Sequence, residues 1–147
     1  MPSSTLTKFG YPATLIGESE HWTVLLRPQQ VTLGSLVLVC REPVTRFGAV
    51  SPAAFAGLQA IVAQVETMLQ CYVRYEKINY LMLMMVDPDV HFHVIPRYQG
   101  ERCHGPDSFP DAGWPGPPLL AQAVEPHTSL RDDITRQLRR LWAKPSA

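Results

Sequence analysis

The sequence lacks the features that mark several large classes of protein. Its 13 basic and 13 acidic residues leave no net charge, so it has no charge excess of the kind that basic nucleic-acid binders and polybasic membrane-surface proteins use. It has only three cysteines and no Cys-x-x-Cys pair, which argues against a disulfide framework and a thiolate zinc site. Its apolar runs are far shorter than the ~20 residues that span a bilayer. We therefore expect a small-molecule or protein partner, no nucleic acid, no membrane, and a reducing compartment such as the cytoplasm.

The length of 147 residues predicts one compact domain. A chain of this size buries roughly 70% of the surface that its unfolded form exposes, which is enough for a core without disulfides or a structural metal. The first residues contain no apolar stretch behind a basic start, so no signal peptide is expected. Within the single domain we expect a core over residues 1–105 and an appended arm and helix over residues 106–147.

The apolar pattern predicts an α+β fold with about five antiparallel strands and one long helix. Ser51 and Pro52 are typical of a helix start, because serine caps the first turn and proline lacks the backbone N–H that would stay unpaired there. Apolar residues then recur at three- and four-residue spacing as far as Tyr72, which predicts a helix of roughly twenty residues. Short β-branched and apolar runs bounded by turn residues predict the strands. These strands are expected at residues 14–16, 22–26, 35–40, 78–86 and 90–95.

The C-terminal part of the chain predicts an irregular arm followed by a helix. Residues 105–118 are rich in proline and glycine, which oppose regular structure. Beyond them, Ser129 to Asp132 resembles a capping box, and apolar residues continue at helical spacing as far as Leu141. Phe109 and Trp114 are expected to anchor the arm on its own domain or on a second copy of the chain.

The segment that ends in Pro-Arg concentrates polar side chains on one face of a predicted strand. Side chains alternate along a strand, so the apolar residues 90, 92 and 94 share one face. The opposite face holds Asp89, His91, His93 and Arg97. Two imidazoles about 7 Å apart with a guanidinium downstream can hold an anion. An edge strand with a polar outer face is the simpler alternative, but the strict alternation after a strongly apolar run favours a functional site.

A metal site is a further alternative for the same residues. His91 and His93 could place two nitrogens on one ion, with Asp89 as an oxygen ligand. No histidine or glutamate follows at the short spacing that such a site needs, so we assign no metal ligands.

The stretch VHFHVIPRY resembles the signature of the histidine-triad superfamily, in which three histidines alternate with apolar residues before Pro-Arg. The resemblance covers roughly residues 10–100, including TLGSLVLVCREPVTRF, the helix that begins at Ser-Pro, and Asn79. It implies an α+β fold, usually a homodimer, and hydrolysis or transfer at the α-phosphate of a nucleotide. The implied substrates are dinucleoside polyphosphates or nucleoside phosphoramidates, with a purine nucleotide as the expected ligand. No cofactor is required, although a divalent metal ion could accompany the nucleotide.

The resemblance also implies roles for individual residues. His91 matches the middle histidine, a nucleophile that forms a nucleotidyl intermediate, which suits neutral imidazole near pH 7. One ring nitrogen attacks, and the other donates to the backbone carbonyl of the first triad position. His93 and Arg97 are expected to hold oxygens of the α-phosphate by charge-assisted hydrogen bonds. Asn79 is expected near the ribose or the phosphate.

Several positions depart from the family pattern. Asp89 replaces the first histidine, so the triad is incomplete. Ser35 stands where many relatives carry histidine, and Arg27 stands where an asparagine commonly contacts the ribose; we count all three residues among the substrate-binding candidates. The glycine-rich loop that assists the leaving group is missing upstream of Asp89. The main prediction is a nucleotide hydrolase or transferase, and the alternative is a nucleotide-binding protein of the same fold with little or no turnover.

Overall fold

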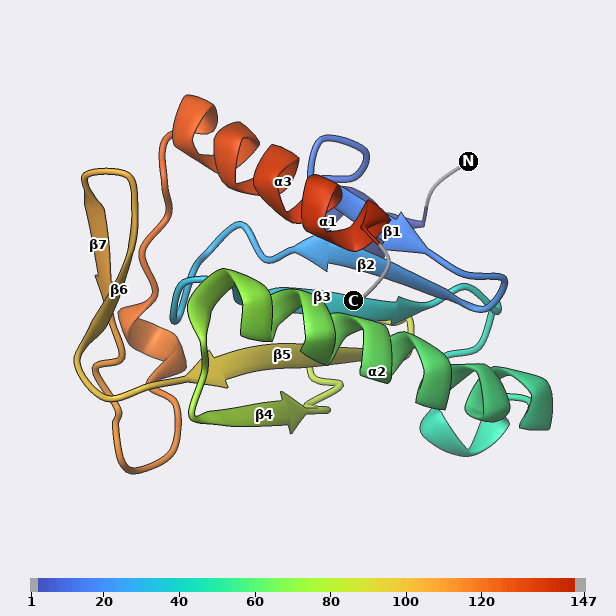
Figure 1. The fold of residues 1–147 in the computed structure, drawn as a ribbon. Helices are drawn as coiled ribbons and strands as arrows, with labels where there is room; N and C mark the ends of the chain where they lie inside the picture. The colour runs from blue at the N-terminus through green and yellow to red at the C-terminus, as the bar shows by residue number, and fades with distance from the viewer. Residues whose placement is uncertain (1–2, 145–147) are drawn as a thin grey trace.

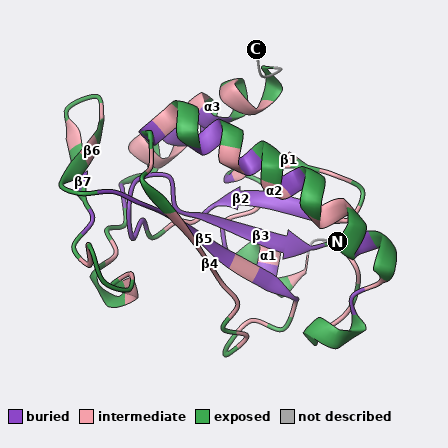
Figure 2. Ribbon diagram, turned by 60° about the horizontal axis from the view of Figure 1, so that its bottom comes forward, coloured by how far each residue is buried: buried purple, intermediate pink, exposed green. Residues whose placement is uncertain are grey.

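The computed structural model describes residues 3–144 and contains a five-stranded antiparallel sheet, as the sequence predicts (Figure 1). The order across the sheet is β1-β2-β3-β5-β4, so β5 lies beside β3 and the preceding strand β4 lies at the edge. The strands are β1 (Leu15–Glu18), β2 (Trp22–Leu26), β3 (Leu36–Cys40), β4 (Lys77–Leu81) and β5 (His91–Arg97). The α+β fold class is therefore confirmed, and the central strands β2 and β3 are buried along their whole length (Figure 2).

The long helix α2 (Pro52–Val73) covers one face of the sheet. It begins where the sequence predicts, because the Ser51 side chain accepts a hydrogen bond from the Ala54 amide and Pro52 fills the first turn. Its buried stripe packs against the even-numbered residues of β2 and β3, together with the indole of Trp22. The helix ends at Val73, and the left-handed backbone of Arg74 closes its last turn.

A short helix that the sequence analysis did not predict, α1 (Ser4–Lys8), lies over the opposite face. Ser3 caps it by accepting a hydrogen bond from the Leu6 amide. Leu6 and Phe9 pack there against the odd-numbered residues of β2 and β3, such as Val37. The face that carries the odd-numbered residues of β5 is therefore covered by the N-terminal segment.

The prediction that residues 105–118 are wholly irregular is wrong. Strands β6 (Glu101–His104) and β7 (Asp107–Pro110) form a separate antiparallel hairpin, in which His104 pairs with Asp107. Gly105, with φ of 58°, and Pro106 form the two-residue turn between them. Glycine and proline thus shape the reversal and leave the flanking residues free to pair. The hairpin spans the predicted boundary at residue 105, and the division into core and arm stays a prediction.

The C-terminal helix α3 (Thr128–Ala143) packs against α2 and β1 (Figure 1). Its cap differs from the predicted capping box at Ser129, because the ring of His127 accepts the hydrogen bond from the Leu130 amide. Short 3-10 turns, η1 (Phe47–Ala49) and η2 (Leu120–Gln122), complete the described elements. Within residues 3–144, no helix is both long enough and apolar enough to cross a membrane.

The loop before the histidine strand is longer than predicted. The strand expected over residues 78–86 ends at Leu81, and residues 82–90 form a loop. Met84 adopts a positive φ of 52° in this loop, a conformation outside the strand region, and Met85 and Val86 are exposed. Small shifts also occur elsewhere: β1 starts one residue later than predicted, and β5 runs through Pro96 as far as Arg97.

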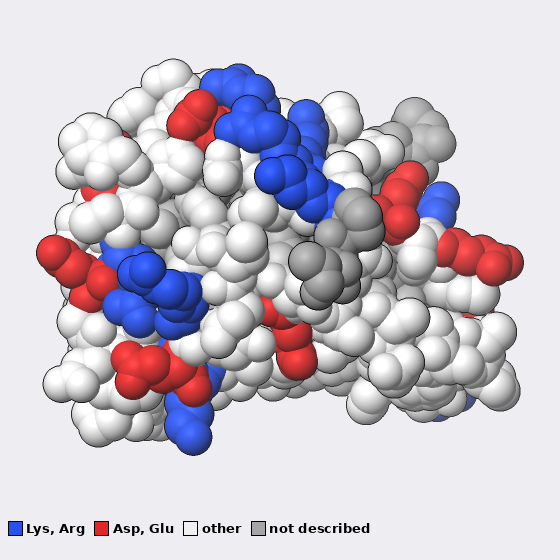
Figure 3. Space-filling model, viewed as in Figure 1, with Lys and Arg blue, Asp and Glu red and all other residues white. Residues whose placement is uncertain are grey.

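Charge is distributed in small mixed groups on the face shown in Figure 3. Basic side chains gather along α3 and near the β6–β7 hairpin, and acidic side chains lie beside both groups. Much of the face between them is uncharged. This distribution agrees with the absence of net charge in the sequence.

Candidate functional site

Strand β5 places His91 and His93 side by side beneath the N-terminal segment. Both residues point to the face that packs against α1, because they pair across the sheet with Val39 and Val37, which belong to the cluster under that helix. Their ring centroids are 5.2 Å apart and the ring planes are nearly perpendicular. The alternation read from the sequence therefore places the two imidazoles as predicted.

The backbone carbonyl of Asp89 orients His91. Its oxygen lies 2.6 Å from Nδ1 of the imidazole. A carbonyl oxygen can only accept a hydrogen bond, so Nδ1 carries the proton and Nε2 of the neutral ring carries a lone pair. A side-chain replacement at position 89 leaves this arrangement possible, because the acceptor belongs to the backbone.

His93 interacts with a basic partner. Nε of Arg27 lies 3.3 Å from Nδ1 of His93 and donates to it. Burial lowers the pKa of His93 to about 4, and the positive charge of Arg27 adds to this effect. His93 is therefore neutral at physiological pH. The structure brings Arg27, His91 and His93 together.

The aromatic ring of Phe9 covers both imidazoles. Its centroid lies 6.0 Å from each of the two ring centroids, and only 2% of His91 and 8% of His93 remains exposed. Two contacts tie this segment to the loop before β5: Lys8 pairs with Asp87 at 3.1 Å, and the Asp89 amide donates to the Thr5 hydroxyl. Sequence reasoning missed these residues. The sequence signals that could have indicated this segment were a possible helix cap at Ser3 and the apolar residues Leu6 and Phe9 after it.

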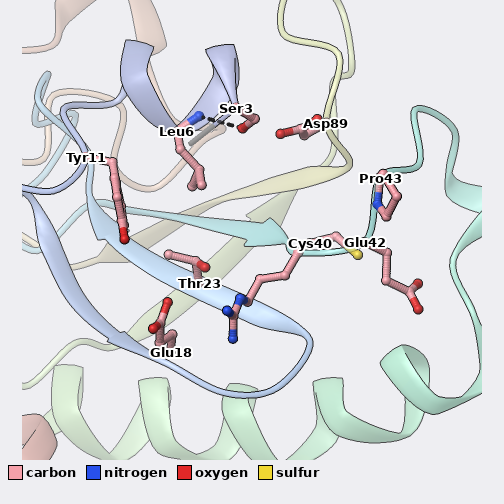
Figure 4. A pocket seen from close by; sticks show the side chains of 10 residues that line it. Ser3, Leu6, Tyr11, Glu18, Thr23, Cys40, Glu42, Pro43 and Asp89 are labelled. Carbon is pink, nitrogen blue, oxygen red and sulfur yellow. Dashed lines mark hydrogen bonds between the residues drawn. The ribbon is translucent and has the colours of Figure 1, made fainter. Parts of the chain in front are cut away.

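Asp89, two residues before His91, borders a cavity. The cavity has a volume of about 500 Å³ and lies between α1 and the end of β3 (Figure 4). The carboxylate points toward Ser3, and Glu18 and Glu42 also line the cavity. A second cavity, of about 110 Å³, is lined by residues that include Lys8, Phe9, Arg27 and Glu125.

Arg97 and Asn79 form a separate cluster at the other end of β5. Arg97 is only 4% exposed and pairs with Asp111, while its remaining hydrogen bonds go to the Asn79 side-chain oxygen and the Gly116 carbonyl. Four residues along a strand separate Arg97 from His93 by about 13 Å. The structure therefore brings Asn79 and Arg97 together, but not next to the imidazoles. Sequence reasoning missed Asp111, although a buried guanidinium requires an anionic partner.

Ser35 is fully buried in the turn before β3. Its hydroxyl donates to the Thr32 carbonyl at 2.8 Å and accepts from the Thr32 amide, while Gln30 accepts from the Ser35 amide. These hydrogen bonds hold the turn that leads into β3. The predicted contacts of Ser35, Asn79, Asp89, Arg27 and Arg97 with a substrate stay predictions.

The structure adds no further ligand to the possible metal site at Asp89, His91 and His93. Among residues 3–144, no group of three or more histidine, cysteine, aspartate or glutamate side chains is placed to hold an ion.

Comparison with solved structures identifies the architecture. A histidine triad protein from Sinorhizobium meliloti matches with a TM-score of 0.73 at 22% identity, over 95% of each chain. A hypothetical histidine triad nucleotide-binding protein from Sulfolobus tokodaii matches with a TM-score of 0.69 at 17% identity, over 94% of this chain and 89% of that one. The NitFhit protein of C. elegans matches with a TM-score of 0.65 at 16% identity, over 88% of this chain, which spans only 27% of the length of that protein.

No protein-family model and no curated protein sequence matches this chain. The structural likeness extends over nearly the whole chain. The chain has the fold of the histidine-triad proteins.

Proposed function

We propose that the protein binds a purine nucleotide and cleaves dinucleoside polyphosphates or nucleoside phosphoramidates at the α-phosphate, with His91 as the nucleophile. The 2.6 Å contact between Nδ1 of His91 and the Asp89 carbonyl carries the proposal. It leaves the lone pair on Nε2, which is the atom that must attack phosphorus. The neighbouring imidazole of His93 supplies a hydrogen-bond donor on the same face.

The reaction proceeds in two displacements. Nε2 of His91 attacks the α-phosphorus and forms a phosphorus–nitrogen bond, while the bond to the leaving group breaks and its electron pair departs with that group. A water oxygen then attacks the same phosphorus, the electron pair of the phosphorus–nitrogen bond returns to Nε2, and a proton of the water passes to solvent. For transfer, another nucleophile replaces water. The Asp89 carbonyl stabilises the positive charge that develops on the ring in the first step.

The charges around the histidines favour one orientation of the substrate. The larger cavity has a volume in the range of small-molecule sites, and three carboxylates outnumber the single guanidinium of Arg41 in its lining, so it suits an uncharged nucleoside better than a phosphate. Lys8 and Arg27 line the smaller cavity together with one acidic residue, Glu125, so positive charge predominates there and favours an anion. We place the phosphates on the Arg27 side of His93, where a divalent metal ion could accompany them.

A panel of diadenosine polyphosphates and adenosine phosphoramidates tests the proposal. Wild-type protein is expected to release AMP, and intact-mass measurement after rapid quenching without acid should detect a nucleotidyl adduct. The variant His91→Asn is expected to lose both signals, whereas His21→Asn, a matched change in the turn before β2, should retain them. Unchanged turnover in His91→Asn overturns the assignment of the nucleophile.

A nucleotide-binding protein without turnover is the second candidate function. The observation that favours it is the near-complete burial of His91 beneath Phe9. This candidate predicts that calorimetry detects adenine nucleotides at micromolar dissociation constants while no adduct and no AMP appear. Detection of the adduct excludes it.

A homodimer is the expected assembly. Strand β4 forms one edge of the sheet, and the loop that follows it exposes Met85 and Val86. An unpaired strand edge beside exposed apolar side chains favours pairing with a second copy. Sedimentation equilibrium at micromolar concentration is expected to give twice the mass of 16.5 kDa, and a monomer at all concentrations would contradict the expectation.

A further inference from the structure

The partner of His93 determines which of its ring nitrogens carries the proton. Arginine has five N–H donors and no acceptor, so the Nδ1 atom that faces Nε of Arg27 has to offer a lone pair. In a neutral imidazole the proton then resides on Nε2. His91, whose Nδ1 faces a carbonyl oxygen, has the opposite arrangement. The two neighbouring rings are therefore held in opposite tautomers.

The Arg27 guanidinium is itself fixed in place. Its Nη1 donates to the Gln29 carbonyl at 2.7 Å, and the Arg27 carbonyl accepts a hydrogen bond from the buried Gln30 side chain at 2.6 Å. These contacts hold the residue on both its side chain and its backbone. Its Nε–H consequently points to His93 as a preset donor.

The groups around His93 oppose its protonation. Burial is the largest influence, and three neighbours also lower the pKa of His93: Arg27, which directly follows β2, His91 on the same strand, and Lys8 at the end of α1. Only Asp87, in the loop before β5, raises it, and Asp87 is paired with Lys8. With a pKa of about 4, His93 stays neutral across the physiological range.

We infer that Arg27 is a positioning residue that holds His93 as a neutral Nε2–H donor, and that it thereby selects substrates whose leaving group departs without a proton. The inference rests on the proposed function and narrows its substrate class to phosphoanhydrides.

Leaving groups differ in their need for a proton. When the phosphorus–oxygen bond of a polyphosphate breaks, the electron pair stays on a phosphate oxygen, which is a stable anion at neutral pH. When the phosphorus–nitrogen bond of a phosphoramidate breaks, the electron pair stays on a strongly basic nitrogen, which has to gain a proton. An imidazolium at His93 could supply that proton, whereas a neutral imidazole N–H is a far weaker acid. The arrangement around Arg27 thus favours polyphosphates.

Nitrogen-15 NMR of the histidine rings tests the tautomer without any substrate. In the wild-type protein between about pH 6 and pH 8, His93 is expected to show the proton on Nε2 only. Arg27→Met removes both the donor and the charge, and is expected to give mixed tautomers and a higher pKa. Arg27→Gln keeps an N–H donor of similar reach and should restore the wild-type tautomer. A proton on Nδ1 in the wild type, or an unchanged tautomer and pKa in Arg27→Met, overturns the inference.

Kinetics test the link to substrate choice. Wild-type protein is expected to prefer a diadenosine polyphosphate over an adenosine phosphoramidate in kcat/KM, and Arg27→Met to reduce that preference about tenfold, the change that one pKa unit of acidity produces. An unchanged preference refutes the selection of leaving groups. If wild-type protein cleaves neither substrate, the proposed function fails, and the NMR result still decides whether Arg27 sets the tautomer. Should Arg27→Met not fold, the wild-type spectrum and Arg27→Gln decide it.

Discussion

Arg97 donates two parallel hydrogen bonds to Asp111, from Nε to Oδ2 at 2.7 Å and from Nη2 to Oδ1 at 3.0 Å. The two residues come from different parts of the fold: Arg97 ends β5, and Asp111 follows the β6–β7 hairpin. Asp111 also accepts a hydrogen bond from the Tyr98 amide. This buried contact fastens the proline-rich arm to the strand that carries both histidines.

Removal of Asp111 is expected to destabilise the protein strongly. Asp111→Ala leaves the buried Arg97 guanidinium without its anion, and such losses lower the free energy of unfolding by about 3–5 kcal/mol. Urea denaturation followed by circular dichroism measures the change. Arg136→Ala, which breaks the exposed pair with Asp133, serves as a control and should cost no more than about 0.5 kcal/mol. Equal effects of the two changes would contradict this prediction.

Phe9 is expected to shield His91 from reagents in solution. Phe9→Ala removes the ring that covers both imidazoles, and a loss of about 1.4 kcal/mol in the stability of the α1 segment raises its open population about tenfold. Modification of His91 by diethylpyrocarbonate, followed by peptide mass spectrometry, should accelerate accordingly. Phe47→Ala, a matched change near Phe92 on the other side of β5, should leave that rate unaltered. A rate that responds equally to both changes would show that Phe9 is not the shield.

His93 is expected to make stability depend on pH in the acidic range. The pKa of His93 is about 4 in the folded protein and ordinarily 6.5, so the unfolded chain binds more protons between these values. The contribution of His93 is therefore fully present above about pH 6.5 and is lost as the pH falls toward 4. His93→Gln cannot titrate, so it should flatten this part of the curve. Parallel curves for wild type and variant in urea denaturation would refute the assignment.

Gly17 is expected to tolerate no side chain. It lies where the pairing of β1 with β2 shifts register, and a Cβ atom there would clash with the indole of Trp142 in α3. Gly17→Ala should lower the melting temperature through an overpacking cost of about 1–3 kcal/mol. Gly57→Ala, inside α2 and with ordinary contacts only, should instead raise stability by about 0.5–1 kcal/mol. A stabilising effect at both positions would disprove the contact between α3 and β1.

Elements with strong local signals could be predicted from the sequence. The Ser51-Pro52 start and the long apolar period identified α2, and strict alternation placed His91 and His93 on one face. Each of these signals lies within a single element. The helix or strand period then determines which side chains share a face, without any knowledge of tertiary contacts.

Other features depend on tertiary contacts and could not be predicted. Helix α1 has only five residues, too few to show a period, and the packing of Phe9 on the sheet stabilises it. The chain has 13 acidic residues, and Asp111 can be identified as the partner of Arg97 only when the course of the proline-rich arm is known. The contact from Arg27 to His93 likewise joins residues that are distant in sequence.

The pairing of basic side chains around the histidines determines how the site responds to dissolved salt. Lys8 is bound to Asp87, whereas Arg27 faces the neutral ring of His93 from a partly buried position. Counterions at physiological ionic strength screen exposed charges beyond about 8 Å, but they screen a partly buried charge less. An anion held by Arg27 should therefore lose little affinity as the salt concentration rises, in contrast to ligands of proteins that rely on a broad basic surface.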